Sequence, residues 1–188
     1  PLSGFTIKEI KNLALVNNFN FLGVISFVDP IKTSTKAAVK KAKSLGVSIK
    51  IITGDSLEVA IAVAKEIGLI KRSNQAMTGT AWQQLSPAQK VKALNNKVVF
   101  ARVNPEQKYE IVNTLRHHCN VGFLGEGIND APALKIAGVS LVVNSAADIA
   151  REAADIILVN KNLNVILDGI EYGRRVFANT TKDIKATL

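Results

Sequence analysis

The stretch that decides the fold is residues 121–135, which read V-G-F-L-G-E-G-I-N-D-A-P-A-L-K. Its apolar start, residues 121–124, predicts a short buried strand. Gly125 and Gly127 predict a turn that can approach a ligand closely, and Pro132 is typical of the first turn of a helix. The sequence therefore predicts a strand, a tight loop and a helix start.

Three polar side chains fall in that loop, namely Glu126, Asn129 and Asp130. Two carboxylates and an amide at the end of a strand suit Mg²⁺ and phosphate. The alternative is an ordinary strand-to-helix loop in which the glycines only shape the turn. The loop alone leaves both interpretations open, so the residues at the ends of the other strands decide between them.

Composition indicates one globular core. The chain has 188 residues, and 47% of them are hydrophobic, which is enough to bury one sizeable core. Its single cysteine, Cys119, excludes an internal disulfide and suits a reducing compartment. Residues 1–8 do not resemble a signal peptide, and no run approaches the roughly 18 apolar residues of a membrane helix. We expect a soluble piece.

The net charge of +9 raises the question of a nucleic-acid partner. Four of the lysines, however, recur at helical spacing beside apolar residues: Lys32, Lys36, Lys40 and Lys43. That spacing is typical of the solvated face of an amphipathic helix. No recognition motif with interleaved aromatic residues is present, so we expect no nucleic-acid partner.

Strands and helices alternate along the chain. The predicted strands are residues 21–28, 47–52, 98–103, 121–124, 138–143 and 154–159. The predicted helices include residues 33–45, residues 147–153 and a final helix from Leu163 towards Leu188. A further helix is predicted to begin at a capping box of Asp55 and Glu58 and to run through Ile67. Residues 69–96 are a connecting region, helical in part over 83–94, that Trp82 anchors to the body. This order predicts an α/β fold, with a Rossmann-like parallel sheet and helices on both faces.

Two further motifs follow predicted strands. Thr53, Gly54 and Asp55 close one strand, where a hydroxyl and backbone N–H groups suit phosphate or merely shape the turn. Asn104 opens a helix, with Gln107 at its third position, and places Lys108 in the first turn. A cation is slightly unfavourable there, so either an anion binds beside Lys108 or the lysine simply faces the solvent. Ligands bind at the carboxyl ends of parallel strands, so we expect these groups and the Glu126 loop to form one site.

Together these motifs resemble a known family. T-G-D-S at 53–56, N-P-E-Q-K at 104–108 and G-E-G-I-N-D-A-P-A-L at 125–134 resemble the phosphorylation domain of P-type cation-transporting ATPases, which has a haloacid-dehalogenase-like fold. D-P-I-K at 29–32 resembles the D-P-P-R hinge of that family. The segments 147–159 and 173–179 resemble its bacterial magnesium-transporting branch.

The resemblance implies an organisation and a location. Residues 1–20 would be a remnant preceding the hinge, 21–165 the phosphorylation-domain core, and 166–188 a stalk helix leading towards a membrane segment. The implied location is the cytoplasmic side of an integral membrane protein, in the bacterial inner membrane. The implied partners are the nucleotide-binding and transmembrane domains of the same protein and the transported cation, which this piece does not identify.

Two features depart from the family pattern. The catalytic aspartate of the family lies in D-K-T-G-T, and this chain contains no such segment. The nucleotide-binding domain, which would make most of the contacts with ATP, is also absent. The resemblance therefore implies that the isolated chain is inactive. Glu126 stands where the family has an aspartate that binds Mg²⁺. Because Mg²⁺ demands near-octahedral geometry, the extra methylene would displace the carboxylate or weaken the site, unless the loop relaxes and Glu126 still binds the ion.

The resemblance also implies roles in forming and hydrolysing an aspartyl-phosphate. Thr53 and Gly54, with Asp55 beside them, would hold the phosphoryl group, and Lys108 would neutralise its charge. Asn129 would donate a hydrogen bond, while Asp130 would either orient Lys108 or help the metal. Glu126 would be the Mg²⁺ ligand, with the reservation above.

Other interpretations remain open from the sequence. The chain could be a binding or regulatory module that keeps the fold without chemistry, or a self-standing phosphatase that uses Asp29 as its nucleophile. The cluster His117, His118 and Cys119 lacks partners at zinc-like spacing. We expect it to be a helix end with a buried or half-buried thiol.

Overall fold

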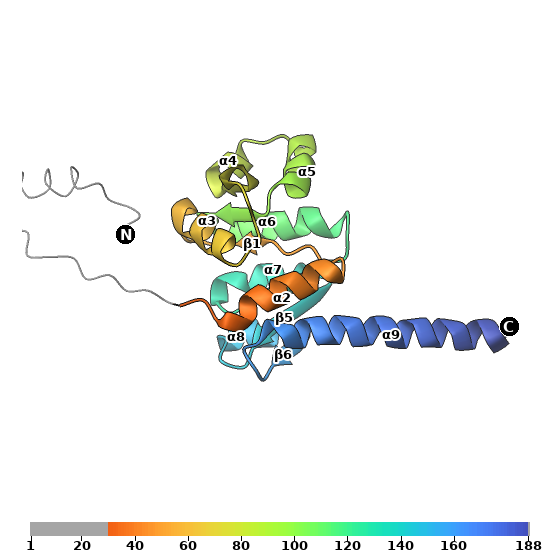
Figure 1. Ribbon diagram of the computed structural model, residues 1–188. Helices are drawn as coiled ribbons and strands as arrows, with labels where there is room; N and C mark the ends of the chain where they lie inside the picture. The colour runs from red at the N-terminus through yellow and green to blue at the C-terminus, as the bar shows by residue number, and fades with distance from the viewer. Residues whose placement is uncertain (1–29, 188) are drawn as a thin grey trace, which may run out of the picture. The chain divides into compact units, whose positions relative to one another are not determined.

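The structure is a computed structural model that describes residues 30–187. The predicted strand at 21–28 and the remnant at 1–20 lie outside the described residues, as does Leu188. Contacts group Lys32–Leu188 into one compact unit, and its elements are labelled in Figure 1.

All described strands are parallel, and they form two sheets of three strands. The first sheet has the order β1 (Ile51–Ile52), β3 (Val99–Ala101), β2 (Ala76–Thr78), and the second has the order β4 (Gly122–Gly125), β5 (Val139–Val143), β6 (Ile156–Leu158). The predicted α/β class with parallel strands is therefore confirmed. The expected single sheet is divided into two. Within residues 30–187, β1 and β4 each pair with a strand on one side only, and no strand lies between them to join the two sheets.

The first sheet packs with helices around an aromatic pair. The helices of this half are α3 (Leu57–Glu66), α4 (Gly79–Gln83), α5 (Pro87–Asn96) and α6 (Pro105–Arg116). Trp82 is fully buried against Phe100, with ring centroids 5.7 Å apart in an edge-to-face arrangement. Its indole N–H donates to Glu110 Oε2 at 2.9 Å. The prediction that Trp82 anchors the connecting region is confirmed.

Within that connecting region the sequence did not indicate a strand. Residues 69–96 contain a 3₁₀ turn at Ser73–Gln75 and the strand β2, before α4 and α5 begin. β2 reads only Ala-Met-Thr, which is too short for an alternating pattern to be recognised. The strand is stabilised by its parallel pairing with β3, which the local sequence does not indicate.

The second sheet is tied together by a buried serine. The short helices of this half are η2 (Ile128–Asp130), α7 (Ala131–Ile136) and α8 (Asp148–Glu152). Ser140 on β5 is 2% exposed. Its N–H and its hydroxyl both donate to Asp155 Oδ2 at 2.8 Å, and the Asp155 N–H donates back to the hydroxyl at 2.9 Å. These bonds link β5 to the start of β6.

Helix α2 (Thr33–Ser44) packs against the first half of α9 (Leu163–Thr187). Ala38 and Ala42 meet Leu167 in a small apolar cluster, and Lys41 forms an ion pair with Asp168 at 2.5 Å. Arg174 Nη1 donates to the carbonyl oxygen of Leu45. Beyond Arg174, α9 is almost entirely exposed, and it extends past the rest of the unit in Figure 1.

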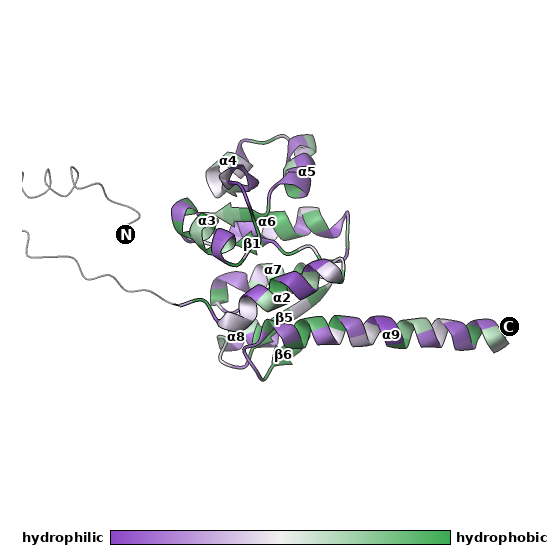
Figure 2. Cartoon of the chain, in the orientation of Figure 1, coloured by the Kyte–Doolittle hydropathy of each residue, from purple (hydrophilic) through white to green (hydrophobic). Residues whose placement is uncertain are grey.

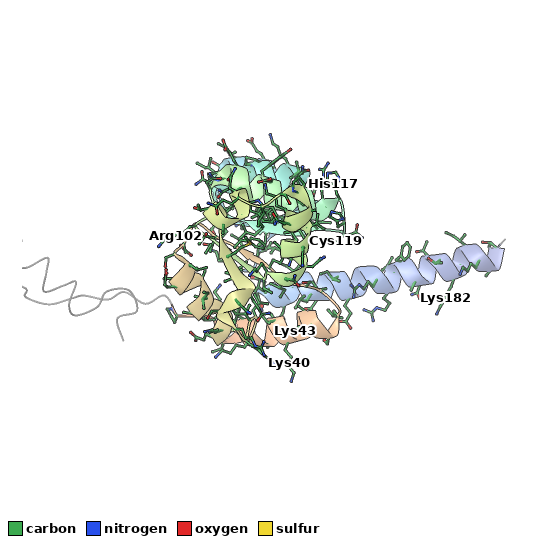
Figure 3. All side chains as sticks on the ribbon, turned by 90° about the horizontal axis from the view of Figure 1, so that it is seen from above. Lys40, Lys43, Arg102, His117, Cys119 and Lys182 are labelled. Carbon is green, nitrogen blue, oxygen red and sulfur yellow. The ribbon has the colours of Figure 1, made fainter. Side chains whose placement is uncertain are left out.

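The predicted solvated lysine face of α2 is confirmed. Lys36, Lys40 and Lys43 are exposed while Ala38 and Val39 are buried. Figure 2 shows the hydrophilic stripe along α2, and Figure 3 shows Lys40 and Lys43 projecting from it. Over residues 30–187, no helix combines the length and apolar character needed to cross a bilayer.

The buried serine gives the first prediction. Ser140→Ala removes the hydroxyl that bridges β5 and the start of β6, so the free energy of unfolding should fall by about 1–3 kcal/mol. Ser145→Ala, at an exposed position two residues beyond β5, is the matched control and should change stability little. Urea unfolding of both variants measures the difference, and equal stabilities would contradict the account of this link.

Candidate functional site

The Thr53 loop is fastened to the end of the neighbouring strand. The Thr53 N–H donates to the carbonyl of Phe100 at 2.9 Å, and the Val103 N–H donates to the carbonyl of Thr53 at 3.0 Å. The Arg102 N–H donates to the carbonyl of Asp55 at 2.8 Å. The loop after β1 and the loop after β3 are therefore held side by side at the carboxyl edge of the first sheet.

The predicted Asp55–Glu58 capping box is wrong. Ser56 is the N-cap of α3, and its side chain accepts the N–H of Val59. Asp55 is instead engaged with Thr53: the Thr53 hydroxyl donates to Asp55 Oδ2 at 2.9 Å, and the Asp55 N–H donates to that hydroxyl at 3.1 Å. Because its carboxylate bonds Thr53 instead, the next residue caps the helix.

The start of α6 is as predicted. Asn104 and Gln107 form a reciprocal capping box, with the Gln107 N–H 2.8 Å from Asn104 Oδ1 and the Asn104 N–H 3.1 Å from Gln107 Oε1. The box fixes the first turn of α6, which holds Lys108. The backbone there exposes the positive end of the helix dipole, so the lysine needs a negative neighbour.

Asp130 is that neighbour. Lys108 Nζ lies 2.7 Å from Asp130 Oδ1, and the two side chains are only 15% and 14% exposed. The other oxygen, Oδ2, accepts the N–H of Glu126 at 3.2 Å and the N–H of Gly127 at 3.1 Å. The carboxylate thus joins the first turn of α6 to the loop after β4, and both of its oxygens have donors.

These bonds set the ionisation of Asp130. Partial burial alone would raise the pKa of this carboxyl, but the hydrogen bond from Lys108, the N–H of Gly127, the charge of Lys108 and the N–H of Glu126 act against it. Together they hold the pKa of Asp130 below its ordinary value. The ionised form of the carboxyl is therefore favoured, as an ion pair requires.

The described residues do not form a metal site by themselves. No group of three or more His, Cys, Asp or Glu side chains within residues 30–187 is arranged to hold an ion. Both oxygens of Asp130 are occupied by donors, whereas the side chains of Glu126 and Asn129 are exposed in the same loop. Their oxygens suit Mg²⁺, and an octahedral set needs further ligands from outside this group.

The predicted site residues therefore fall into two groups. Lys108, Asp130 and the Glu126 loop are joined by hydrogen bonds, and Thr53 is joined to Asp55. Among residues 30–187, no direct hydrogen bond links Thr53 to Lys108 or Asp130. Each group lies at the carboxyl ends of parallel strands.

Two features of the structure were not foreseen. Arg102 has φ +50°, the only positive φ of a non-glycine residue among residues 30–187, and it turns the chain between β3 and α6. Nothing in the sequence signals this, because arginine rarely adopts such a φ. The expected buried or half-buried thiol is also wrong: Cys119 is exposed, because it lies in the turn between α6 and β4 (Figure 3).

The Asp130 geometry predicts a pH dependence. A carboxyl whose pKa is lowered by folding stabilises the fold above its unfolded pKa, and this contribution is lost as pH falls through the lowered folded pKa. The wild-type free energy of unfolding should therefore decline below about pH 4, and Asp130→Asn should decline less. Asp148→Asn removes a carboxylate that is 92% exposed and should keep the wild-type slope. Denaturant unfolding from pH 2 to pH 6 measures all three, and a wild-type slope in Asp130→Asn would contradict the account.

Comparison with known proteins bears out the resemblance. A family model described as haloacid dehalogenase-like hydrolase matches residues 5–138. "Magnesium-transporting ATPase, P-type 1" of Escherichia coli (strain K12) is 45% identical over 166 residues, which are 88% of this chain and 18% of that protein. "Calcium-transporting ATPase 1" of Bacillus cereus (strain ATCC 10987 / NRS 248) is 36% identical over 172 residues, 90% of this chain and 19% of that protein.

Solved structures agree with these relatives. The crystal structure of a zinc-transporting PIB-type ATPase in its E2.Pi state matches with a TM-score of 0.65 and 29% identity, over 83% of this chain and 21% of that one. The chain thus spans 18–19% of the length of the two relatives above. The resemblance to P-type cation-transporting ATPases is confirmed, and the chain belongs to the haloacid dehalogenase-like hydrolase family.

Proposed function

We propose that this chain is the C-terminal part of the phosphorylation domain of an ATP-driven cation pump. It supplies the groups that bind phosphate and Mg²⁺ while an aspartyl-phosphate forms and is hydrolysed, and a segment outside this chain supplies the nucleophilic aspartate. The observation that carries the proposal is the ion pair between Lys108 and Asp130, which is 2.7 Å long and largely buried. It holds a cation at the carboxyl edge of parallel strands, where such folds bind ligands.

The divided sheet leaves a place for one further strand. β1 and β4 precede the two loops that carry the site, and each pairs with a strand on one side only among residues 30–187. Both are apolar, yet Leu124 on β4 is 38% exposed. One further parallel strand between β1 and β4 would join the two sheets and cover these edges. A carboxylate at the end of that strand would lie between the Thr53 loop and the Glu126 loop.

Each site residue then has a role in binding the phosphoryl group. Thr53 and Gly54 offer a hydroxyl and a backbone N–H to its oxygens, and Asp55, which accepts the Thr53 hydroxyl, orients that hydroxyl. Lys108 neutralises the negative charge that gathers around the transferred group, and Asn129 donates a hydrogen bond. Such chemistry depends chiefly on positioning and electrostatic stabilisation.

Asp130 orients Lys108 in this scheme. Its two oxygens accept three donors, from Lys108, Glu126 and Gly127, which favours an orienting role over direct metal binding. Glu126, aided by Asn129, is then the residue of this chain that would hold Mg²⁺, with Asp130 close by. When bound, the ion would neutralise charge on the phosphoryl oxygens.

The remaining parts belong to the rest of the protein. We propose that ATP is held mainly by a nucleotide-binding domain outside this chain and that α9 leads towards a membrane-spanning domain, with this unit on the cytoplasmic side of a bacterial inner membrane. The relatives are named as transporters of magnesium, calcium and zinc. A magnesium pump is the proposal that the 45% identity favours.

Removing either member of the ion pair tests the site in the full-length pump. Lys108→Ala takes away the cation, and Asp130→Ala takes away the group that orients it, so both should lower phosphoenzyme turnover by roughly a hundredfold or more. Lys135→Ala, at an exposed lysine on α7, is the control and should keep wild-type turnover. Phosphoenzyme formation and decay with radiolabelled ATP measure the effect. Wild-type rates in both site variants would contradict the assignment.

A separate measurement tests the need for an outside nucleophile. The 188-residue chain, incubated with an aryl or acyl phosphate and Mg²⁺, should show no turnover above the metal-only background. Asp29 lies outside the described residues and is the alternative nucleophile. Mg²⁺-dependent turnover that Asp29→Asn abolishes would show that the chain is instead a self-standing phosphatase.

A further inference from the structure

Gly125, the last residue of β4, packs against Asp130. We propose that Gly125 is a positioning residue for the phosphoryl-transfer site: its missing side chain is the space in which the Asp130 side chain folds back to hold both Lys108 and the loop. The role in phosphoryl transfer rests on the proposed function. The close packing of Gly125 against Asp130 is seen in the structure itself.

The space at Gly125 is too small for any side chain. A Cβ built there would lie 2.7 Å from Asp130 Cβ and 3.2 Å from both Asp130 Cγ and Oδ2. The closest of these atoms is a Cβ attached to the backbone at the start of α7, not the flexible end of a long side chain. Asp130 would therefore have to move as a whole, together with the backbone of η2.

Conformational freedom does not explain this glycine. Gly46 and Gly68 are the only glycines with positive φ within residues 30–187, so Gly125 adopts a backbone conformation open to other residues. Gly127, in the same loop, provides the contrast. A Cβ at Gly127 would meet Asp130 Oδ2 at 3.7 Å and the nitrogen of Asn129 at 3.9 Å, which are ordinary contact distances.

Displacing Asp130 would disturb three bonds at once. Oδ2 would lose the N–H groups of Glu126 and Gly127, at 3.2 and 3.1 Å, and Oδ1 would move from Lys108. Lys108 would then remain in the first turn of α6 without the carboxylate that offsets the helix dipole. The loop that carries Glu126 would also lose the bonds that fix its backbone. One added methyl group would thus misplace the cation and the metal-binding side chain together.

Crystal structures test the geometry directly. The 188-residue chain is solved as wild type, Gly125→Ala and Gly127→Ala, and the distances from the Asp130 carboxylate to Lys108 Nζ and to the N–H groups of Glu126 and Gly127 are compared. We expect all three distances to lengthen beyond hydrogen-bond range in Gly125→Ala and to stay as in wild type in Gly127→Ala. Unchanged distances in Gly125→Ala, or an equal displacement in both variants, would overturn the proposal.

A double-mutant cycle keeps the proposal testable if Gly125→Ala unfolds readily. Asp130→Gly removes the Cβ that the new methyl group would meet. If the clash is the cause, Gly125→Ala should lower the unfolding midpoint in the wild-type background and lower it much less in the Asp130→Gly background. Equal losses in the two backgrounds would show that Gly125 is needed for another reason, and the proposal would fail.

The role in the reaction is tested in the full-length pump. Gly125→Ala should lower phosphoenzyme turnover by roughly a hundredfold. Gly122→Ala, elsewhere on β4, where a Cβ meets nothing closer than 3.8 Å, should keep it. Wild-type turnover in Gly125→Ala would overturn the role. If the wild-type pump formed no phosphoenzyme at all, the proposed function would fail, while the variant structures would still decide whether Gly125 places Asp130.

Discussion

The ion pair between Lys108 and Asp130 is the contact on which the arrangement of the site depends. It connects α6, which follows the first sheet, to the loop that follows β4 in the second sheet. Asp130 also accepts two backbone N–H groups of its own loop. A single carboxylate thus sets the direction of the lysine and the shape of the loop, and the space that it occupies exists because residue 125 has no side chain.

The sequence allowed the prediction of elements whose determinants are local. The capping box of Asn104 and Gln107, the amphipathic α2 and the run of parallel strands all follow from short-range patterns. The three motif loops were expected at one edge because carboxyl ends of parallel strands share it. That expectation held for Lys108 and Asp130, whose side chains are hydrogen-bonded. The helix dipole had suggested a bound anion beside Lys108, and the structure places a carboxylate of the chain there.

The features that sequence reasoning missed depend on residues that meet only in the fold. Ser56 caps α3 because the Asp55 carboxylate bonds the neighbouring Thr53 hydroxyl, a choice that propensity does not decide. β2 exists because β3 pairs with it, and the positive φ of Arg102 is imposed by bonds on either side of it. The division of the sheet likewise depends on which strands pair in the fold, since β1 and β4 each have one unpaired edge within residues 30–187.

The central claim is that these two edges receive one further strand, which brings the nucleophilic aspartate to the Lys108–Asp130 pair. Amide hydrogen exchange tests it most directly, by comparing the 188-residue chain with a longer protein that includes the segment preceding it. The account predicts greater protection of β1 and β4 in the longer protein, while the outer strands β2 and β6 change little. Unchanged exchange in β1 and β4, with the longer protein folded, would contradict the account.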